Sequence, residues 1–162
     1  MNPIKILIDD FNIPATYILR AIRIEQITHD TLRGWYKRSH LPAMVKKRLT
    51  PLALQTWGDN NPSPEAKRLW QCYFPDSKPH IYHYLHYTMD IPIATLADWA
   101  DCRTSTIHRI LRQDRLHRRQ LQAIGKPAME YIEALRSPKA GGGTDERYQI
   151  LYRALHDKDR IK

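Results

Sequence analysis

Hydrogen-bond donors gather between residues 103 and 112, where seven polar or basic side chains occur and no acidic residue interrupts them. On one helix, the spacing of Ile107 and Ile110 would turn these two inward and leave the polar side chains outside. A helix of this kind reads base edges in the DNA major groove from its first residues, while longer cations reach phosphates or guanine. The predicted contacts are Arg103, Thr104, Ser105, Thr106, His108, Arg109 and Arg112.

Two short helices joined by a tight turn would present these side chains to a ligand. Ala97 supplies the small residue that crossing helices need where their backbones approach. Asp101 stands in the turn, where glycine is often found, and aspartate tolerates left-handed backbone better than most residues. Thr104 is a better helix cap than Arg103, because its hydroxyl can accept a first-turn amide. The apolar positions expected to pack between the helices are Leu96, Ala100, Cys102, Ile107 and Ile110.

Taken together, residues 93–111 resemble the helix-turn-helix of bacterial and phage DNA-binding proteins, in particular lac-repressor-type headpieces. The resemblance implies that the second helix lies in the major groove and that Thr104, Ser105 and Arg109 touch DNA. A helix pair that only contacts protein is the alternative that these residues leave open.

Residues 19–42 are similar to phage Cro-type regulators and form a second, weaker candidate pair. An apolar-x-x-Trp pattern at Leu32 and Trp35, followed by a proline that would open another helix, carries the similarity. Counted from Ala21, the turn is one residue longer than in the downstream pair, and Asp30 would bring a negative charge near DNA. The implied contacts are Thr28, His29, Thr31, Arg33, Lys37 and Arg38, with Lys46 and Lys47 on phosphates. A lobe that merely supports the downstream pair is the alternative.

The charge of the chain favours a polyanionic partner. Its 162 residues include 26 Lys and Arg against 17 Asp and Glu, for a net charge of +9 and a pI near 9.7. Residues 1–58 carry a net +5 and residues 93–140 a net +4, while residues 59–92 between them carry −1. This pattern differs from a basic tail on an acidic body. A basic surface that is simply solvated is the alternative.

Composition and punctuation predict an all-α protein made of two small helical lobes, each with a helix-turn-helix-like unit, plus a tethered C-terminal helix. Hydrophobic residues make up 42% and charged residues 27%, and eleven prolines mostly separate periodic stretches. Pro51 is expected to break or kink one helix, and residues 4–8 to form a first helix or an extended segment. The predicted divisions are a lobe at 1–58, a Pro-rich connector with a short helix at 59–79, a lobe at 80–136, a flexible linker at 137–143 and a helix at 144–162.

His80, His83 and His86 are the residues most suggestive of a metal site. They recur at every third position, a spacing that spreads them around a helix, so only adjacent pairs could share a metal. We expect them to face solvent or DNA phosphate and expect no metal or other cofactor. The aromatic residues between 73 and 87 could stack single-stranded bases, but this region is neutral, which favours core packing.

Catalytic constellations are weak. Asp9 and Asp10 suggest nuclease carboxylates, but neighbouring residues on a strand point to opposite sides. Arg109, His117 and Tyr131 form only part of a tyrosine-recombinase pattern. Phosphate-binding loops, a serine elbow and a zinc-protease helix are absent from the sequence. We therefore expect a protein that is not an enzyme.

The C-terminal helix is expected to have an apolar stripe formed by Tyr148, Leu151, Tyr152 and Leu155. A tethered helix of about 15 residues is marginal unless that stripe is covered. It could dock on its own chain, exchange into a second subunit to form a homodimer, or bind another regulator.

The expected function is sequence-specific binding of double-stranded DNA, as a transcriptional regulator of bacterial, phage or mobile-element origin. With only two cysteines, no signal peptide and no apolar run near the ~20 residues of a membrane span, a cytoplasmic location and no membrane contact are expected. A DNA-binding accessory protein of replication, recombination or conjugation is the rival. RNA binding is less favoured, because no RNP-like strand motif or GXXG loop occurs.

Overall fold

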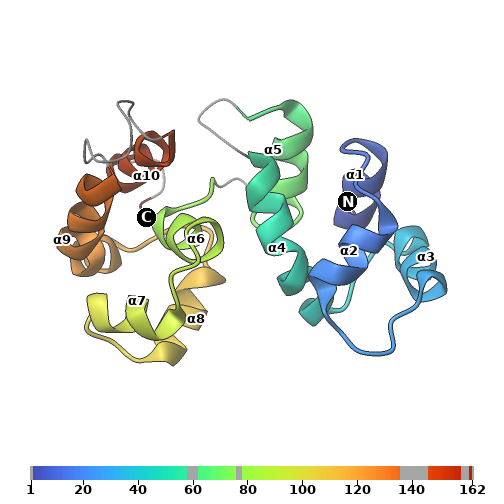
Figure 1. Ribbon diagram of the computed structural model, residues 1–162, viewed down its shortest axis with the longest axis horizontal. Coiled ribbons are helices and arrows are strands. Elements are labelled where there is room, and N and C mark those ends of the chain that lie inside the picture. The colour runs from blue at the N-terminus through green and yellow to red at the C-terminus, as the bar shows by residue number, and fades with distance from the viewer. Residues whose placement is uncertain (1, 58–61, 76–77, 136–145, 158–160, 162) are drawn as a thin grey trace. The chain divides into compact units, whose positions relative to one another are not determined.

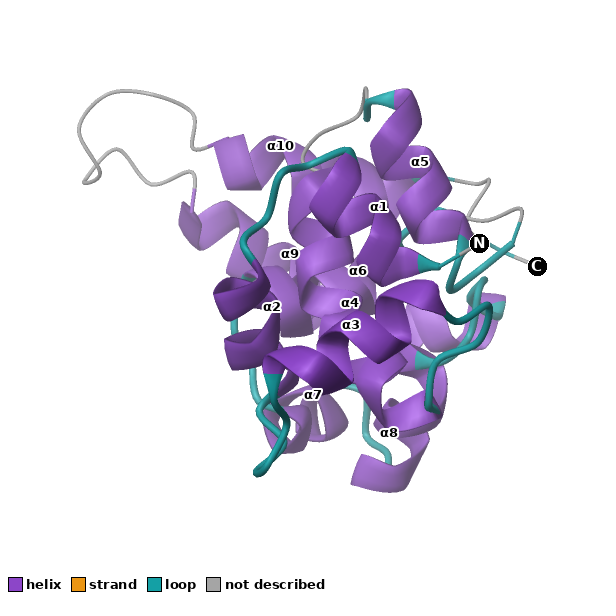
Figure 2. Ribbon diagram, turned by 90° about the vertical axis from the view of Figure 1, so that its right-hand side faces the viewer, coloured by secondary structure: helices purple, strands orange, loops and turns teal. Residues whose placement is uncertain are grey.

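The computed structural model describes residues 2–57, 62–75, 78–135, 146–157 and 161, and the chain divides into two compact units, Met1–Pro75 and Asp76–Lys162 (Figure 1). Within the described ranges the regular structure is helical, apart from an isolated bridge between Leu116 and Ile161 (Figure 2). The predicted all-α class is therefore confirmed. None of the helices in this part of the chain has the length and apolar character needed to cross a bilayer.

The described part of the first unit contains five helices. They are α1 (Pro3–Asp9), α2 (Ala15–Ile22), α3 (His29–Lys37), α4 (Ala43–Trp57) and α5 (Pro64–Gln71). Helix α2 packs on α3 and α4, α1 packs on α3 and α5, and α4 packs on α5. The apolar residues that face one another across these contacts form the core, with Ile4, Ile18 and Leu49 fully buried. Residues 4–8 are helical because Pro3 sits in the first turn and the Asn2 side chain accepts the Ile4 amide at 2.9 Å.

Helix α4 runs through Pro51 without a break, so the predicted break is wrong, while the kink stays a prediction. A proline inside a helix removes one hydrogen bond and costs about 3 kcal/mol. Here Pro51 is exposed, so the carbonyl it leaves unpaired can bind water. Leu49, Leu52 and Ala53 on the other side are buried, and this packing offsets the cost.

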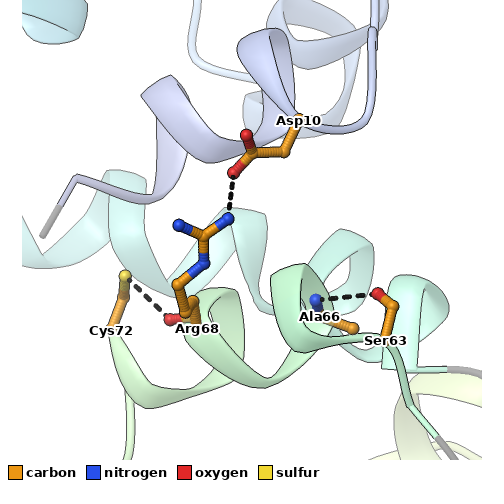
Figure 3. A network of polar contacts seen from close by, with 5 residues as sticks. All are labelled: Asp10, Ser63, Ala66, Arg68 and Cys72. Carbon is orange, nitrogen blue, oxygen red and sulfur yellow. Dashed lines mark hydrogen bonds and ion pairs between the residues drawn. The ribbon is translucent and has the colours of Figure 1, made fainter.

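Helix α5 belongs to the first unit, although the sequence assigned residues 59–79 to a connector. Leu69 and Trp70 are fully buried and face α1 and α4. Figure 3 shows how polar contacts complete the attachment, with Arg68 donating to the carboxylate of Asp10 at 3.1 Å. Prolines mark the ends of this segment in the sequence but do not show where it packs. The burial of its two large apolar side chains makes it part of the core of the first unit.

Replacement of Ser63 by alanine is expected to lower the free energy of unfolding by about 1 kcal/mol. The Ser63 hydroxyl accepts the Ala66 amide at 3.1 Å at the start of α5 (Figure 3), and alanine leaves that amide without its cap. Urea unfolding followed by circular dichroism measures the change. Ser39→Ala, at an exposed position outside any helix, is the matched control and should change stability by less than about 0.5 kcal/mol. Equal effects of the two substitutions would contradict the capping role.

The second unit begins, among its described residues, with a short α6 (Ile81–His83) that continues into a π-helical turn η1 (Tyr84–Thr88). The helices that follow are α7 (Ile93–Trp99), α8 (Thr104–Leu111), α9 (Arg118–Leu135) and α10 (Glu146–His156). Helix α7 packs on α8 and α9, and α6 packs on α8 and α10. Leu96 of α7, Ile107 of α8 and Ile124 of α9 are fully buried and form part of the core of this unit.

Helix α10 packs on α9 and α6 of its own unit. Tyr148, Leu151 and Leu155 are buried there, as the predicted stripe requires, whereas Tyr152 is 39% exposed and was wrongly placed in it. Ala154 takes the buried position instead, because it lies three residues after Leu151 on the same side of the helix. The predicted linker at 137–143 lies outside the described residues, and a homodimer or regulator contact through this helix stays a prediction.

Candidate nucleic-acid interface

The turn between α7 and α8 has the geometry that its residues predict. Asp101 adopts left-handed backbone with φ of 50°, and Ala97 and Ala100 are buried where the helices meet. The Cys102 amide donates to the Ala97 carbonyl at 3.0 Å and closes the turn. Cys102 itself is only half-buried, so its expected place in the core is wrong, because the chain leaves the interior at this point.

Helix α8 begins one residue earlier than the preferred cap at Thr104 implied. Arg103 is the capping residue, with extended backbone, and Thr104 is already the first helical residue. The threonine hydroxyl therefore does not cap the helix, and no side chain of α8 or the turn supplies such a hydrogen bond. The first-turn amides of an uncapped helix retain their capacity to bind an anion.

Asp101→Ala is expected to lower the free energy of unfolding of the second unit by about 1 kcal/mol, and Asp101→Gly to leave it unchanged or raise it. Left-handed backbone is costly for a residue with a Cβ and almost free for glycine, and aspartate lies between them. Thermal unfolding of the full chain measures both. Asp98→Ala, exposed on α7, is the control. Equal stability of the alanine and glycine variants would contradict the role assigned to the turn.

Two buried histidines hold the C-terminal end of α8. His80 Nε2 lies 3.2 Å from the Ile110 carbonyl and His83 Nε2 lies 3.0 Å from the Leu111 carbonyl. Because a carbonyl only accepts, each of these nitrogens carries the proton and donates it. These are last-turn carbonyls, which a helix cannot satisfy internally. The histidines therefore attach α6 to the end of α8.

The placement of these histidines corrects the expectation that they face solvent or phosphate. His80 and His83 are both 0% exposed, and their rings stack with centroids 3.6 Å apart. His83 Nδ1 also accepts a hydrogen bond from the backbone amide of His80 at 3.1 Å. Both ring nitrogens of a neutral His83 therefore have a hydrogen-bond partner. His86 is half-buried and bonds to the Ile91 carbonyl. Sequence spacing missed this because the carbonyl partners of His80 and His83 lie far along the chain, on another helix.

The opposite side of α8 faces outward. Ile107, Ile110 and Leu111 are buried, and the predicted contact residues lie on the remaining surface. Those exposed are Arg103, Thr104, Ser105, Arg109 and Arg112, and those half-buried are Thr106 and His108. All seven predicted side chains of this set therefore come together on one helix and its first flanking residues.

The cations of this helix have no acidic partner among the described residues. Arg103, Arg109 and Arg112 form no ion pair there, and Arg112 donates from Nε only to the His108 carbonyl at 3.3 Å. A surface guanidinium without a carboxylate partner keeps its remaining donors for a ligand. The arrangement can therefore bind an anionic partner without breaking an internal contact.

Arg118 and Arg119 were missed by the sequence analysis. They are exposed in the first turn of α9, after a loop that Leu116 anchors by its burial. The His117 amide, which donates to Gln120 Oε1 at 2.9 Å, helps to define where this helix starts. The signal was present as a cluster of basic residues directly after α8, at 112, 115, 118 and 119.

In the first unit the predicted contacts lie on α3 and its flanking residues, except Lys46 and Lys47, which lie on α4. Thr28 caps the helix by accepting the Thr31 amide at 3.3 Å, as predicted, and Leu32 and Trp35 are buried beneath it. Arg33 is exposed but lies 3.4 Å from an Asp30 carboxylate oxygen. The other exposed members are His29, Lys37, Arg38 and Lys47, while Thr31 and Lys46 are half-buried. The Lys46 ammonium also lies over the Tyr73 ring, 5.5 Å from its centroid.

Three of the residues considered for catalysis, Asp9, Asp10 and Tyr131, make structural contacts. Asp9 accepts the Tyr36 hydroxyl at 2.9 Å, which raises the pKa of that phenol, and Asp10 pairs with Arg68. Tyr131 packs against Trp99. Within the described ranges, no three His, Cys, Asp or Glu side chains are grouped to hold a metal ion.

Two aromatic residues, Tyr82 of α6 and Tyr84 of η1, are part of the core, as expected from the neutrality of this region. Tyr82 and Tyr84 are buried, and the Tyr82 hydroxyl donates to the Gln120 carbonyl at 2.7 Å, which connects α6 to α9. Burial raises the pKa of Tyr82 well above its usual range. These rings are not available to stack on bases.

No protein-family model matches the chain, and comparisons with curated proteins and solved structures found no significant match.

Proposed function

We propose that the chain binds double-stranded DNA in a sequence-specific manner and that α8 enters the major groove. In this proposal Thr104 and Ser105 contact base edges near the start of the helix, and Arg109 binds guanine through O6 and N7. Arg103 and Arg112 bind phosphates and, together with other cations, displace condensed counterions. The mechanism needs no cofactor and no catalytic step.

The observation that carries the proposal is the two-sided character of α8. One side is buried against α7 and attached to α6 by His80 and His83, so the helix is held rigidly. The other side exposes donors and cations without any acidic partner among the described residues. A rigid, donor-rich helix of eight residues has the dimensions that the major groove admits.

The surroundings of α8 support an anionic partner. Arg118 and Arg119 begin the next helix, and exposed arginines in such a position are suited to bind the phosphate backbone. The second unit, residues 76–162, contains 15 Lys and Arg against 11 Asp and Glu. Phosphate contacts would set the position and orientation of α8 on the duplex, and base contacts would set specificity.

Selection of bound fragments from random double-stranded DNA, followed by footprinting and fluorescence titration, tests the proposal. We expect an enriched sequence that binds at least ~10³-fold more tightly than scrambled duplex at the same salt concentration. Single-stranded DNA and RNA of the same sequence should bind at the non-specific level. Failure to enrich any duplex, or tighter binding of a single strand or of RNA, would refute it.

We propose transcriptional control in the cytoplasm of a bacterium as the role of this binding. A promoter that contains the selected sequence should change its output when the chain is expressed, and mutation of that sequence should abolish the change. Strong bending of the duplex without any effect on the promoter would instead support the rival role, an accessory protein of replication, recombination or conjugation.

A further inference from the structure

The two units have the same order of helices and almost the same spacing along the chain (Figure 1). Helices α1 and α6 begin at Pro3 and Ile81, and helices α2 and α7 begin at Ala15 and Ile93. The number of residues between the two starts is the same for both pairs of helices. The starts of α3 and α8 are separated by the same interval as the starts of α4 and α9. This second interval is shorter than the first by three positions, because the turn between α2 and α3 is longer than its counterpart in the second unit.

Unusual backbone conformations repeat at the same spacing. Five described residues other than glycine have positive φ, and four of them form two pairs separated by the interval from Pro3 to Ile81. Asn12 and Asp90 have φ of 52° and 56°, and Arg23 and Asp101 both have φ of 50°. The fifth, Gln26, has φ of 67° and lies in the longer turn. Left-handed backbone is uncommon for such residues, so this agreement is a strong sign of a repeated fold.

A contact that holds the candidate reading helix also repeats. The Asn2 amide nitrogen donates to the Trp35 carbonyl at 2.7 Å, near the end of α3. His80 is the counterpart of Asn2, since each is the N-cap of the first helix in its unit. Its ring donates to the carbonyl of Ile110, which occupies the same position in α8 that Trp35 occupies in α3. The two units therefore hold the end of α3 and the end of α8 from the same place.

This register makes α3 the counterpart of α8. Leu32 corresponds to Ile107, and both side chains are buried. The same register pairs Ala97 with Leu19, whereas the sequence pattern paired it with Ala21 and so counted one additional turn residue instead of three. The positions of α3 and its flanking residues that correspond to the seven proposed contacts of α8 are occupied by Thr28, His29, Asp30, Thr31, Arg33, Gly34 and Lys37.

We infer that α3 is a second DNA-contacting helix and that one chain reads two duplex segments of different sequence. This inference rests on the proposed function. Asp30 stands where α8 has Ser105, and a carboxylate accepts from cytosine N4. Gly34 stands where α8 has Arg109, so the guanine contact has no counterpart in the first unit. The recognised site is therefore composite and not palindromic, and tethering of the two units increases the affinity for it.

Footprinting of the full chain on its selected duplex tests this inference. We expect two protected segments of unlike sequence, and we expect Arg33→Ala to weaken binding about 5-fold or more and to reduce protection in one segment only. Lys67→Ala removes a positive charge from an exposed position of α5 in the same unit and should leave both segments protected. Circular dichroism verifies that both variants are folded.

Gly34→Arg is expected to add a guanine contact to α3, at the position that corresponds to Arg109 in α8. A Cβ at Gly34 meets no atom within 4 Å, so a side chain can begin there without a backbone clash. Repeated selection with this variant should enrich a guanine at one position of the segment that Arg33→Ala affects. An unchanged selected sequence would contradict the equivalence of α3 and α8.

The outcomes separate the inference from the proposed function. If Arg109→Ala weakens specific binding while Arg33→Ala does not, the second reading helix is refuted and the function stands. A palindromic selected site would also refute it, because two copies of one helix would then read the DNA. If no duplex is selected, both the proposed function and the inference fail.

Discussion

His83→Ala is expected to lower the free energy of unfolding of the second unit by about 3–5 kcal/mol. The substitution removes a fully buried ring and the two hydrogen bonds it makes, to the Leu111 carbonyl and from the His80 amide. Both backbone groups lose a partner in the interior, and a cavity replaces the imidazole. In a unit of this size such a loss lowers the unfolding temperature by more than about 12 °C.

Calorimetry of the full chain measures this effect. The transition of the second unit should shift to lower temperature, while Ser63→Ala, which acts in the first unit, serves as a comparison for the other transition. His117→Ala is the matched control, because its side chain is exposed, and it should alter stability by less than about 0.5 kcal/mol. A loss below about 1 kcal/mol in His83→Ala would show that the buried histidines do not hold α8.

Arg109→Ala is expected to weaken specific DNA binding by about 1–3 kcal/mol, or 5- to 150-fold, while leaving the fold unchanged. The guanidinium is exposed on α8, and no carboxylate among the described residues pairs with it, so its removal breaks no ion pair within them. Arg109→Lys should lose most of the same affinity, because an ammonium cannot reproduce a bidentate contact with guanine. Titration of the selected duplex and a scrambled duplex measures both variants.

Lys126→Ala is the charge-matched control for this prediction. Lys126 is exposed on α9, in the middle of the helix and away from its first turn, so its loss should change specific affinity by less than about 2-fold. If Arg109→Ala weakens both duplexes equally and lowers the salt slope by about one, the side chain binds phosphate and does not read a base. Unchanged affinity for both duplexes would remove Arg109 from the interface.

The features predicted well from sequence are those that depend on near neighbours. The helix after Thr28 was expected over residues 29–38 and is observed at His29–Lys37, because its cap and its apolar spacing are local. The left-handed turn at Asp101 has the same origin, since the residue type determines the cost of positive φ. The exposed side of α8 also follows from periodicity alone.

The features predicted poorly depend on partners far along the chain. His80 and His83 carry polar rings, which sequence spacing places at a surface, yet carbonyls of α8 satisfy them in the interior. The sequence predicted that residues 64–71 belong to a connector, whereas helix α5 packs on α1 and α4 and buries Trp70. Pro51 looked like a helix break, but the packing of the opposite side of α4 maintains the helix.

The sequence by itself determined the helical class, the cap at Thr28, the turn at Asp101 and the donor-rich side of the helix that begins at Thr104. These follow from backbone preferences and from the period of the helix, which act over a few residues. Only the tertiary structure decided which helices share a core, how the end of α8 is held, and that the two units repeat one fold. Those properties depend on hydrogen bonds and burial between distant segments, and neither leaves a pattern in adjacent residues.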